Sequence, residues 1–165
     1  MRIFHTSIAL VLFSSIIACS DFKTPDDTLV TVISNPIANL DPLFSTEANA
    51  QHVNQLIHAG LTRVDKNLLP EPYLAESFKT VDNKTIEFQL RKGCHFQNGR
   101  EIIADDIEKS IQLYRDPIHN SFFQENFKRI LSFEKLDAYH FRLHTSEPFP
   151  SLLIDLSVLK ILPFE

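Results

Sequence analysis

An alternating segment in the middle of the chain constrains the fold most. Across residues 85–91 three apolar side chains alternate with polar ones, namely Ile86, Phe88 and Leu90 with Glu87, Gln89 and Arg91. A period of two is typical of a β-strand with one buried and one solvated face. The turn-forming run Asp82-Asn83-Lys84 directly precedes this segment and favours a hairpin with residues 78–81. The segment therefore predicts an antiparallel strand pair with one face against the core.

Short strands and helices are predicted to alternate through the rest of the chain. Further strands are predicted over residues 29–33, 61–64 and 158–162, and a second hairpin over residues 133–143. Helices are predicted after Ser45 or Thr46 and over residues 105–115, 122–131 and 151–157. Pro70 and Pro72 predict a loop. This mixture predicts an α/β or α+β fold.

The first predicted helix has a defined apolar face and a defined end. Val53, Leu56 and Ile57 have helical spacing and are expected to face the core. Gly60 follows them and is expected to end the helix in a left-handed conformation. The chain has only 3 glycines, so each of them is expected to have a structural reason.

The N-terminus has the pattern of an export signal. Arg2 precedes an apolar run over residues 8–18, which is shorter than the roughly 20 residues that span a bilayer. Residues 16–19, Ile-Ile-Ala-Cys, resemble a bacterial lipobox, whose cysteine becomes lipid-modified and anchors the protein to a membrane. Ordinary secretory cleavage near Ala18 is the alternative. We expect a signal peptide over residues 1–18, a lipid-anchored tether over residues 19–28 that begins at Cys19, and a folded part over residues 29–165.

The charge of the chain argues against a nucleic-acid partner. There are 16 Lys and Arg residues against 21 Asp and Glu residues, a net charge of −5, and no basic run. Affinity for DNA or RNA rises with the number of Lys and Arg side chains that neutralise phosphates. Phosphate-binding loops need several close glycines, which this chain lacks. We expect neither nucleic acid nor a nucleoside triphosphate as a partner.

The reactive residue types form no recognisable catalytic or metal site. No Gly-x-Ser-x-Gly elbow occurs, and Cys94 is expected to act as a small hydrophobe rather than a reactive thiol. His140 and His144 are expected on the polar face of a strand, about 13 Å apart, too far to share a metal ion. Asp105 and Asp106 are interpreted as partners of a helix dipole rather than as an acid pair. We expect no enzyme activity, no cofactor and no metal.

Five short motifs in a fixed order carry a family resemblance. They are residues 39–42 (NLDP), 74–77 (LAES), 90–93 (LRKG), 96–99 (FQNG) and the helix start at 105–107 (DDI). Their order and spacing resemble the first lobe of the family 5 extracellular solute-binding proteins, which serve ABC importers. The resemblance implies the α/β first lobe of a two-lobed, class II-like periplasmic-binding-protein fold. Residues 29–165 would then be a partial lobe, truncated before the second lobe.

The resemblance implies transport rather than catalysis. The expected ligand is an oligopeptide or another small solute, with nickel complexes, haem and sugars left open. The expected partners are the permease subunits of an ABC importer. The expected location is the periplasmic side of the cell envelope, with the protein tethered by lipid at Cys19. Ser34 and Asn35 are candidate residues of the ligand cleft, or a plain turn after the first strand.

Two further expectations accompany the resemblance. The family usually has Ser or Thr at the start of the helix over residues 105–115, where this chain has Ile103, so an N-cap hydrogen bond is expected to be lost. The alternative function is a non-transporting, lipid-anchored fragment or protein-interaction module without a small-molecule ligand.

Overall fold

The computed structural model describes residues 27–28, 30–33 and 35–164. The chain divides into two units, residues 1–34 and 35–165, and the second contains every described helix and strand. Cys19, Ser34 and the predicted signal peptide lie outside the described residues. The strand predicted at residues 29–33 is wrong for residues 30–33, which pair with no strand in the described part of the chain. A β-branched run is not a strand until it packs and pairs, and Val32 is 92% exposed.

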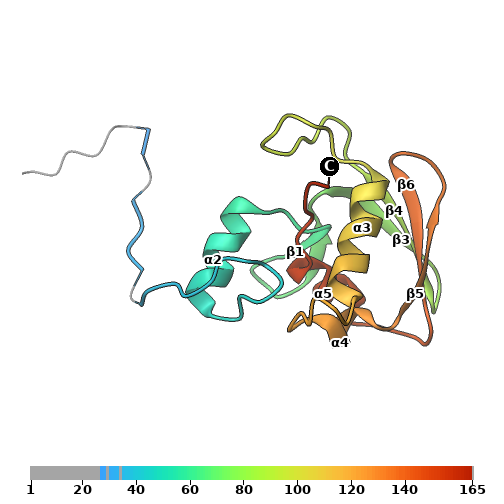
Figure 1. The fold of residues 1–165 in the computed structure, drawn as a ribbon. Helices are drawn as coiled ribbons and strands as arrows, with labels where there is room; N and C mark the ends of the chain where they lie inside the picture. Colours follow the sequence, from blue (N-terminus) through green and yellow to red (C-terminus); the bar gives the residue numbers. More distant parts are fainter. Residues whose placement is uncertain (1–26, 29, 34, 165) are drawn as a thin grey trace, which may run out of the picture. The chain divides into compact units, whose positions relative to one another are not determined.

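A four-stranded antiparallel sheet forms the centre of the second unit (Figure 1). Its strands lie in the order β3 (Ala75–Asp82), β4 (Thr85–Leu90), β6 (His140–Thr145) and β5 (Ile130–Lys135). Both predicted hairpins are confirmed, because β3 pairs with β4 and β5 pairs with β6. The hairpins join through β4 and β6, whose residues are more than 50 positions apart in the sequence, as in the pair Phe88 and Phe141.

An aromatic row crosses the buried face of this sheet. Phe78, Phe88, Phe141 and Phe133 come from β3, β4, β6 and β5, one from each strand in spatial order. The ring centroids of Phe88 and Phe141 are 5.3 Å apart, and those of Phe141 and Phe133 are 4.6 Å apart. Aromatic pairs of this kind contribute about 0.5–1.5 kcal/mol each beyond the area they bury. The row therefore helps to fix the register between the two hairpins.

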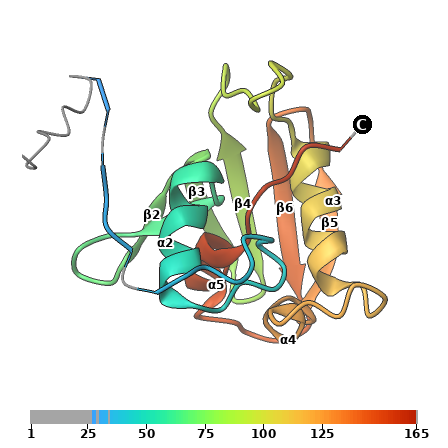
Figure 2. The ribbon, with the colours of Figure 1, turned by 60° about the vertical axis from the view of Figure 1, so that its left-hand side comes forward.

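Helix α3 (Ala104–Arg115) covers the buried face of the sheet (Figure 2). Ile107, Ile111 and Tyr114 recur at helical spacing and are all buried. They confirm the predicted helix and its apolar face. The helix begins after Ile103, which provides no side-chain cap, as expected from its apolar side chain.

The opposite face of the sheet carries a row of alternating charges. Lys79, Glu87, Arg142 and Glu134 are neighbours across β3, β4, β6 and β5 in that order. Arg142 Nε lies 2.8 Å from Glu87 Oε2, and Arg142 Nη1 lies 3.5 Å from Glu134 Oε2. Opposite charges on neighbouring strands stabilise their pairing. This face is polar, as the alternation in the sequence predicts.

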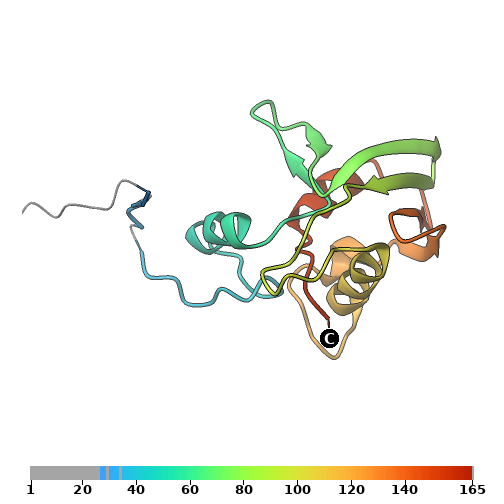
Figure 3. The ribbon, with the colours of Figure 1, turned by 90° about the horizontal axis from the view of Figure 1, so that it is seen from above.

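A two-stranded sheet precedes β3 in the chain. β1 (Thr62–Val64) pairs antiparallel with β2 (Pro70–Pro72), and Figure 3 shows this hairpin leading into β3. The loop predicted at Pro70 and Pro72 is therefore wrong. Proline fits an edge strand, because its missing N–H can face away from the partner strand. In the connecting loop Leu68 has a positive φ of 62°.

Three shorter helices complete this unit: α2 (Ala48–Ile57), α4 (Gln124–Phe127) and α5 (Leu152–Val158). α5 confirms the helix predicted over residues 151–157. The helix predicted over residues 122–131 is wrong beyond Phe127, because residues 130–135 form β5. The strand predicted over residues 158–162 is also wrong, since only a single bridge forms there. None of the described helices is long and apolar enough to cross a bilayer.

α2 buries a different face from the predicted one. Ala50 and Asn54 are buried, whereas Leu56 is 76% exposed. The cap expected at residues 45–46 is wrong as well, because Glu47 occupies the N-cap and makes no side-chain bond. Ser45 is buried instead and accepts a hydrogen bond from Asn54 Nδ2 at 2.5 Å. A polar contact thus replaces the expected apolar one.

Gly60 is required for space rather than for a left-handed conformation. The described glycines with positive φ are Gly93 at 73° and Gly99 at 84°. A Cβ on Gly60 would lie 2.9 Å from the carbonyl oxygen of Ser157 and 3.0 Å from that of Leu156. Side-chain carbons do not approach backbone oxygens so closely. Only glycine lets the chain after α2 pass the end of α5.

Candidate functional site

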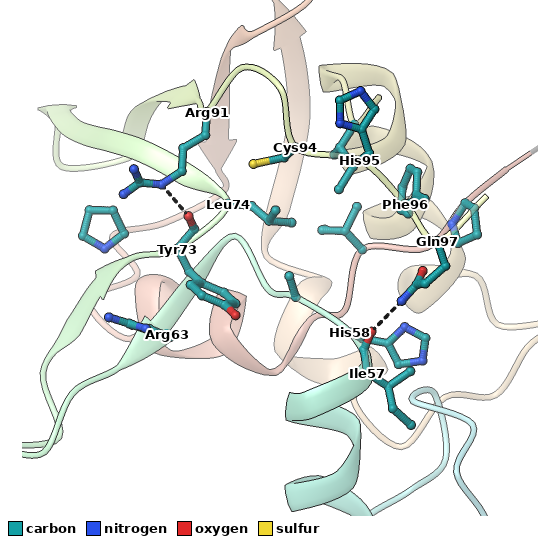
Figure 4. A pocket seen from close by; sticks show the side chains of 15 residues that line it. Ile57, His58, Arg63, Tyr73, Leu74, Arg91, Cys94, His95, Phe96 and Gln97 are labelled. Carbon is teal, nitrogen blue, oxygen red and sulfur yellow. Dashed lines mark hydrogen bonds between the residues drawn. The ribbon is translucent and has the colours of Figure 1, made fainter. Parts of the chain in front are cut away.

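A cavity of about 530 Å³ opens in the second unit, and we call it the main pocket (Figure 4). Its walls come from the end of α2, from β1 and β2, from the loop after β4 and from the segment that follows α5. They are Ile57, His58, Ala59, Arg63, Pro72, Tyr73, Leu74, Arg91, Cys94, His95, Phe96, Gln97, Ile102, Ile161 and Pro163. Segments far apart in the sequence thus meet at one hollow.

A second hollow of about 300 Å³, the side pocket, adjoins the first. His58, Arg63 and Tyr73 line both pockets, whereas Ser157 and Lys160 line the side pocket alone. The two pockets are therefore parts of one groove. Sites for small molecules usually measure about 300–1,000 Å³, so the groove has a suitable size.

Tyr73 and two arginines form one wall of the main pocket. Arg91 Nε donates a hydrogen bond to the Tyr73 carbonyl oxygen at 2.8 Å. The guanidinium carbon of Arg63 lies 5.2 Å from the centroid of the Tyr73 ring, and Arg63 Nε pairs with Glu71 at 2.5 Å. Figure 4 shows both arginines on the side of the pocket where Tyr73 lies. The wall is thus positively charged around an aromatic ring.

The opposite wall ties the loop after β4 to the end of α2. Gln97 Nε2 donates to the Ile57 carbonyl oxygen at 3.0 Å. His95 Nδ1 lies 2.9 Å from the Gly93 carbonyl oxygen. Cys94 is half-buried and packs against the core, in keeping with a small hydrophobe. These contacts fix the width of the main pocket between α2 and the loop.

Lys160 places a buried ammonium group at the side pocket. The residue is 5% exposed, and its Nζ donates a hydrogen bond to the Ser157 carbonyl oxygen at 2.9 Å. Its main-chain N–H donates to Tyr114 Oη at 3.3 Å. Burial lowers the pKa of Lys160, because the charged form loses hydration. The sequence held a signal that we missed, a single lysine inside the apolar run over residues 158–162.

His58 lies between the two pockets at the end of α2. Burial lowers its pKa, and the positive charge of Lys160 lowers it further, while the charge of Asp41 acts in the opposite direction. The ordinary pKa of histidine is about 6.5, so the imidazole of His58 is neutral at pH 7. A neutral imidazole offers one donor and one acceptor to a bound molecule.

The sequence-predicted site residues lie elsewhere or outside the described part. Asn35 lines neither pocket, and its carbonyl oxygen accepts a hydrogen bond from Asn49 Nδ2 at 3.3 Å. Ser34 and Cys19 are outside the described residues. Ligand contact by Ser34 and Asn35 and lipid attachment at Cys19 remain predictions. Four residues of the family motifs line the main pocket, namely Leu74, Arg91, Phe96 and Gln97, although the motifs were interpreted only as marks of the family.

The remaining histidine pair lies on the outer face of the sheet. His140 Nδ1 is 2.8 Å from Asp137, and His144 Nε2 is 3.1 Å from Glu134. In the described part of the chain no group of three or more His, Cys, Asp or Glu residues could hold a metal ion. In the described groove no serine or cysteine side chain is hydrogen-bonded to a histidine. The groove is therefore arranged for binding, with donors and positive charges around apolar walls.

Known proteins resemble this chain in sequence and in fold. Residues 70–164 match the family model of the bacterial extracellular solute-binding proteins, family 5, middle region. The chain is 25% identical over 155 residues to the glutathione-binding protein GsiB of Escherichia coli K12, which covers 92% of this chain and 30% of GsiB. The chain thus spans about 30% of the length of the curated relatives it matches.

Solved structures agree with the family match. NikZ of Campylobacter jejuni, solved with Ni(L-His), is 34% identical with a TM-score of 0.75, over 85% of this chain and 28% of NikZ. AgaA of A. tumefaciens R10, solved with agropinic acid, is 25% identical with a TM-score of 0.72, over 78% and 26%. These proteins are solute-binding proteins rather than enzymes, and their likeness confirms the predicted α/β lobe. Since the family model matches more than half of the 165 residues, the chain belongs to family 5 of the bacterial extracellular solute-binding proteins.

Proposed function

We propose that this chain captures a small solute as part of the binding component of an ABC importer. The observation that carries the proposal is the groove, where a main pocket of about 530 Å³ and a side pocket of about 300 Å³ adjoin. Its apolar side chains can bury part of a solute, and its polar side chains can orient what enters. The relatives' own solutes, glutathione, Ni(L-His) and agropinic acid, are small and polar.

The proposed solute is an oligopeptide or another small polar molecule. Arg63, Arg91 and Gln97 provide side-chain donors, and Tyr73 offers a flat apolar surface between the pockets. A peptide presents backbone acceptors that match such donors, and pockets can take its side chains. The permease subunits of an importer would then receive the solute and move it across the membrane.

Solute binding by the purified chain tests this proposal. We expect the tripeptide Ala-Ala-Ala, glutathione or the nickel–histidine complex to raise Tm with increasing concentration, because a ligand that binds only the folded state stabilises it. Tyr73→Ala should reduce the shift, since Tyr73 lines both pockets. Leu68→Ala is the control, because Leu68 is 77% exposed and lines neither pocket. No shift with any of these solutes, or an equal shift in Tyr73→Ala, would contradict solute capture.

We also propose that the protein is exported and tethered at Cys19 on the periplasmic side of the envelope. The support is the lipobox-like run at residues 16–19 after an apolar stretch of signal-peptide length. Labelled palmitate should enter the wild-type protein and leave Cys19→Ser unlabelled. Equal labelling of both proteins would place any lipid elsewhere, and absence of label from both would favour simple secretory cleavage near Ala18.

A second candidate function is protein–protein contact without a small-molecule ligand. It is favoured by large apolar side chains that remain exposed, namely Leu56 at 76%, Leu68 at 77% and Phe122 at 67%. A contiguous exposed apolar patch often marks a contact site, whereas scattered single side chains are ordinary, so this candidate has weaker support than the groove. Analytical ultracentrifugation separates the candidates, because a stable dimer that ignores all solutes fits the interaction module, and a monomer that binds solute fits transport.

A further inference from the structure

The groove is lined by cationic side chains and by no carboxylates. Among the described residues, Arg63, Arg91 and Lys160 line it together with His58 and His95, whereas no Asp or Glu does. The whole chain has the opposite balance, with 21 acidic and 16 basic residues and a net charge of −5. A cleft lined by one sign of charge concentrates potential and attracts ions of the other sign.

Two of these cations have no acidic partner in the described part of the chain. Arg91 uses Nε to hold the Tyr73 carbonyl oxygen at 2.8 Å, and its terminal nitrogens pair with no carboxylate. Lys160 is 5% exposed, and its ammonium donates to the Ser157 carbonyl oxygen at 2.9 Å. Arg63 differs from both, because it pairs with Glu71. A buried ammonium without a counter-charge is costly, and an anion supplied from outside would remove that cost.

We propose that the groove selects anionic solutes and that Lys160 is the counter-charge of a carboxylate carried by the solute. Arg91 strengthens the positive field at the main pocket and favours the same sign of ligand. The inference rests on the proposed function, because it names the chemical class of the captured solute. A phosphate group offers the same chemistry to an ammonium and a guanidinium, so both anions belong in the test.

The lowered pKa of His58 indicates that the positive charge of Lys160 acts beyond its own position. Its pKa is lowered by burial and then by the positive charge of Lys160, although Asp41 opposes both effects. The charge of Lys160, which lines the side pocket, therefore acts on His58, a residue that lines both pockets. A bound carboxylate would neutralise that charge and make protonation of His58 easier.

Matched acid and amide ligands test the inference. We would titrate the full chain, purified from membranes in detergent, with N-acetyl-Ala-Ala-Ala and with its C-terminal amide by isothermal titration calorimetry. The two probes differ only at the C-terminal group, which is a carboxylate in one and an uncharged amide in the other. We expect the acid to bind about thirtyfold more tightly than the amide, because the amide leaves the buried charge of Lys160 without a counter-charge. Inorganic phosphate is the third probe, and competition with the acid would assign phosphate to the same anion site.

Substitutions of Lys160 and Arg91 test which of these residues produces the preference for the acid over the amide. Lys160→Met keeps most of the apolar stem of the side chain and removes the charge. It should remove the preference for the acid and should leave Tm of the unliganded protein unchanged or higher, because an uncompensated buried charge is removed. A purely structural lysine would lower Tm instead. Arg91→Met is the second variant, and it should weaken the preference without affecting the core. Lys79→Met, in the charge row of the sheet, is the control and should keep the full preference.

The outcomes separate this inference from the proposed function. Equal binding of acid and amide would leave solute capture standing and overturn the selection of anions. Binding of neither probe, together with no shift of Tm by Ala-Ala-Ala, glutathione or the nickel–histidine complex, would contradict both. A preference for the acid that survives in both Lys160→Met and Arg91→Met would overturn the assignment to these cations. A preference that disappears in Lys160→Met and persists in Lys79→Met supports it.

Discussion

Gly60 is surrounded by backbone oxygens on several sides. A glycine is needed here because a side chain would not fit, and not because the backbone is left-handed. A Cβ added at this position would lie 2.9 Å from the carbonyl oxygens of both Ser157 and Thr62. Carbonyl oxygens belong to the main chain and cannot rotate away like a side chain. The close approach joins the segment after α2 to the end of α5, next to the side pocket.

Gly60→Ala is expected to lower the free energy of unfolding by about 1–3 kcal/mol, as overpacking does. Urea unfolding measures it. Gly93 is the matched control, because it has φ of 73° and nothing within 4 Å of its Cβ position. Gly93→Asn should be nearly neutral, since Asn tolerates a left-handed conformation, whereas Gly60→Asn should cost at least as much as Gly60→Ala. A neutral Gly60→Asn would refute the steric account.

His58 is expected to make the fold less stable in weak acid. Its pKa is lowered in the folded state by burial and by Lys160, so the unfolded chain binds more protons below pH 6.5. Stability therefore rises with pH up to about 6.5 and is lost as the pH falls below that value. His58→Gln should lose less Tm than the wild type between pH 7.5 and pH 5.5. Identical losses in the two proteins would show that His58 is not desolvated.

Among the elements, the start of α3 separates two aspartates that look alike in the sequence. Arg100 Nη1 and Nη2 donate to Asp106 at 2.9 and 2.8 Å, and the Ile103 N–H donates to Asp106 Oδ2 at 3.1 Å. Asp106, at the third helical position, thus satisfies the N–H of the N-cap residue Ile103, whose own side chain caps nothing. Asp105 pairs with Lys135 at 2.5 Å on the surface. The dipole interpretation fits Asp105 but misses the buried role of Asp106.

Asp106→Ala is expected to cost about 2–3 kcal/mol of unfolding free energy, because it leaves a guanidinium and a helix N–H without their acceptor. Asp105→Ala is the neighbouring control and should cost less than about 1 kcal/mol, as exposed ion pairs do. Chemical denaturation of both variants gives the comparison. Equal costs for the two would mean that the buried contacts of Asp106 contribute no more than a surface pair.

The β1–β2 loop contains a residue with an unfavourable backbone conformation. Leu68 has φ of 62° and is 77% exposed, so it bears the steric cost of a left-handed conformation without gaining burial. Leu68→Asn is expected to raise the unfolding free energy by about 0.5–1 kcal/mol. Leu69→Asn serves as the control and should give no gain, because Leu69 is exposed without a positive φ. Destabilisation by Leu68→Asn would show that the exposed leucine makes a contact that matters.

Elements that depend on local pattern were predictable, and those that depend on tertiary contacts were not. The alternation in β4 and β6 and the helical spacing in α3 predicted both hairpins and the main helix correctly. β2 was missed because prolines suggested a loop, although an edge strand accepts them. The buried face of α2 was missed because Asn54 pairs with Ser45, a polar contact that hydrophobic periodicity does not register.

For the whole molecule, the sequence indicated the family but not the groove. The ordered motifs predicted the solute-binding family, which residues 70–164 confirm. The groove was missed because Arg63, Arg91 and Lys160 come from three separate segments that meet only in the fold. Long-range pairing, such as the bridge between Gly60 and Lys160, brings them together. Three of the five family motifs contribute residues to the main pocket, namely Leu74, Arg91, Phe96 and Gln97, but only the fold shows that these residues meet at one site.

A titration followed by NMR tests the central claim, that the groove captures a small solute. Amide signals of the full chain would be recorded while N-acetyl-Ala-Ala-Ala is added. We expect concentration-dependent shifts confined to the groove, at His58, Arg63, Tyr73, Arg91 and Lys160, with no change on the outer face of the sheet. Shifts confined to that outer face, or no shifts at all, would contradict the account.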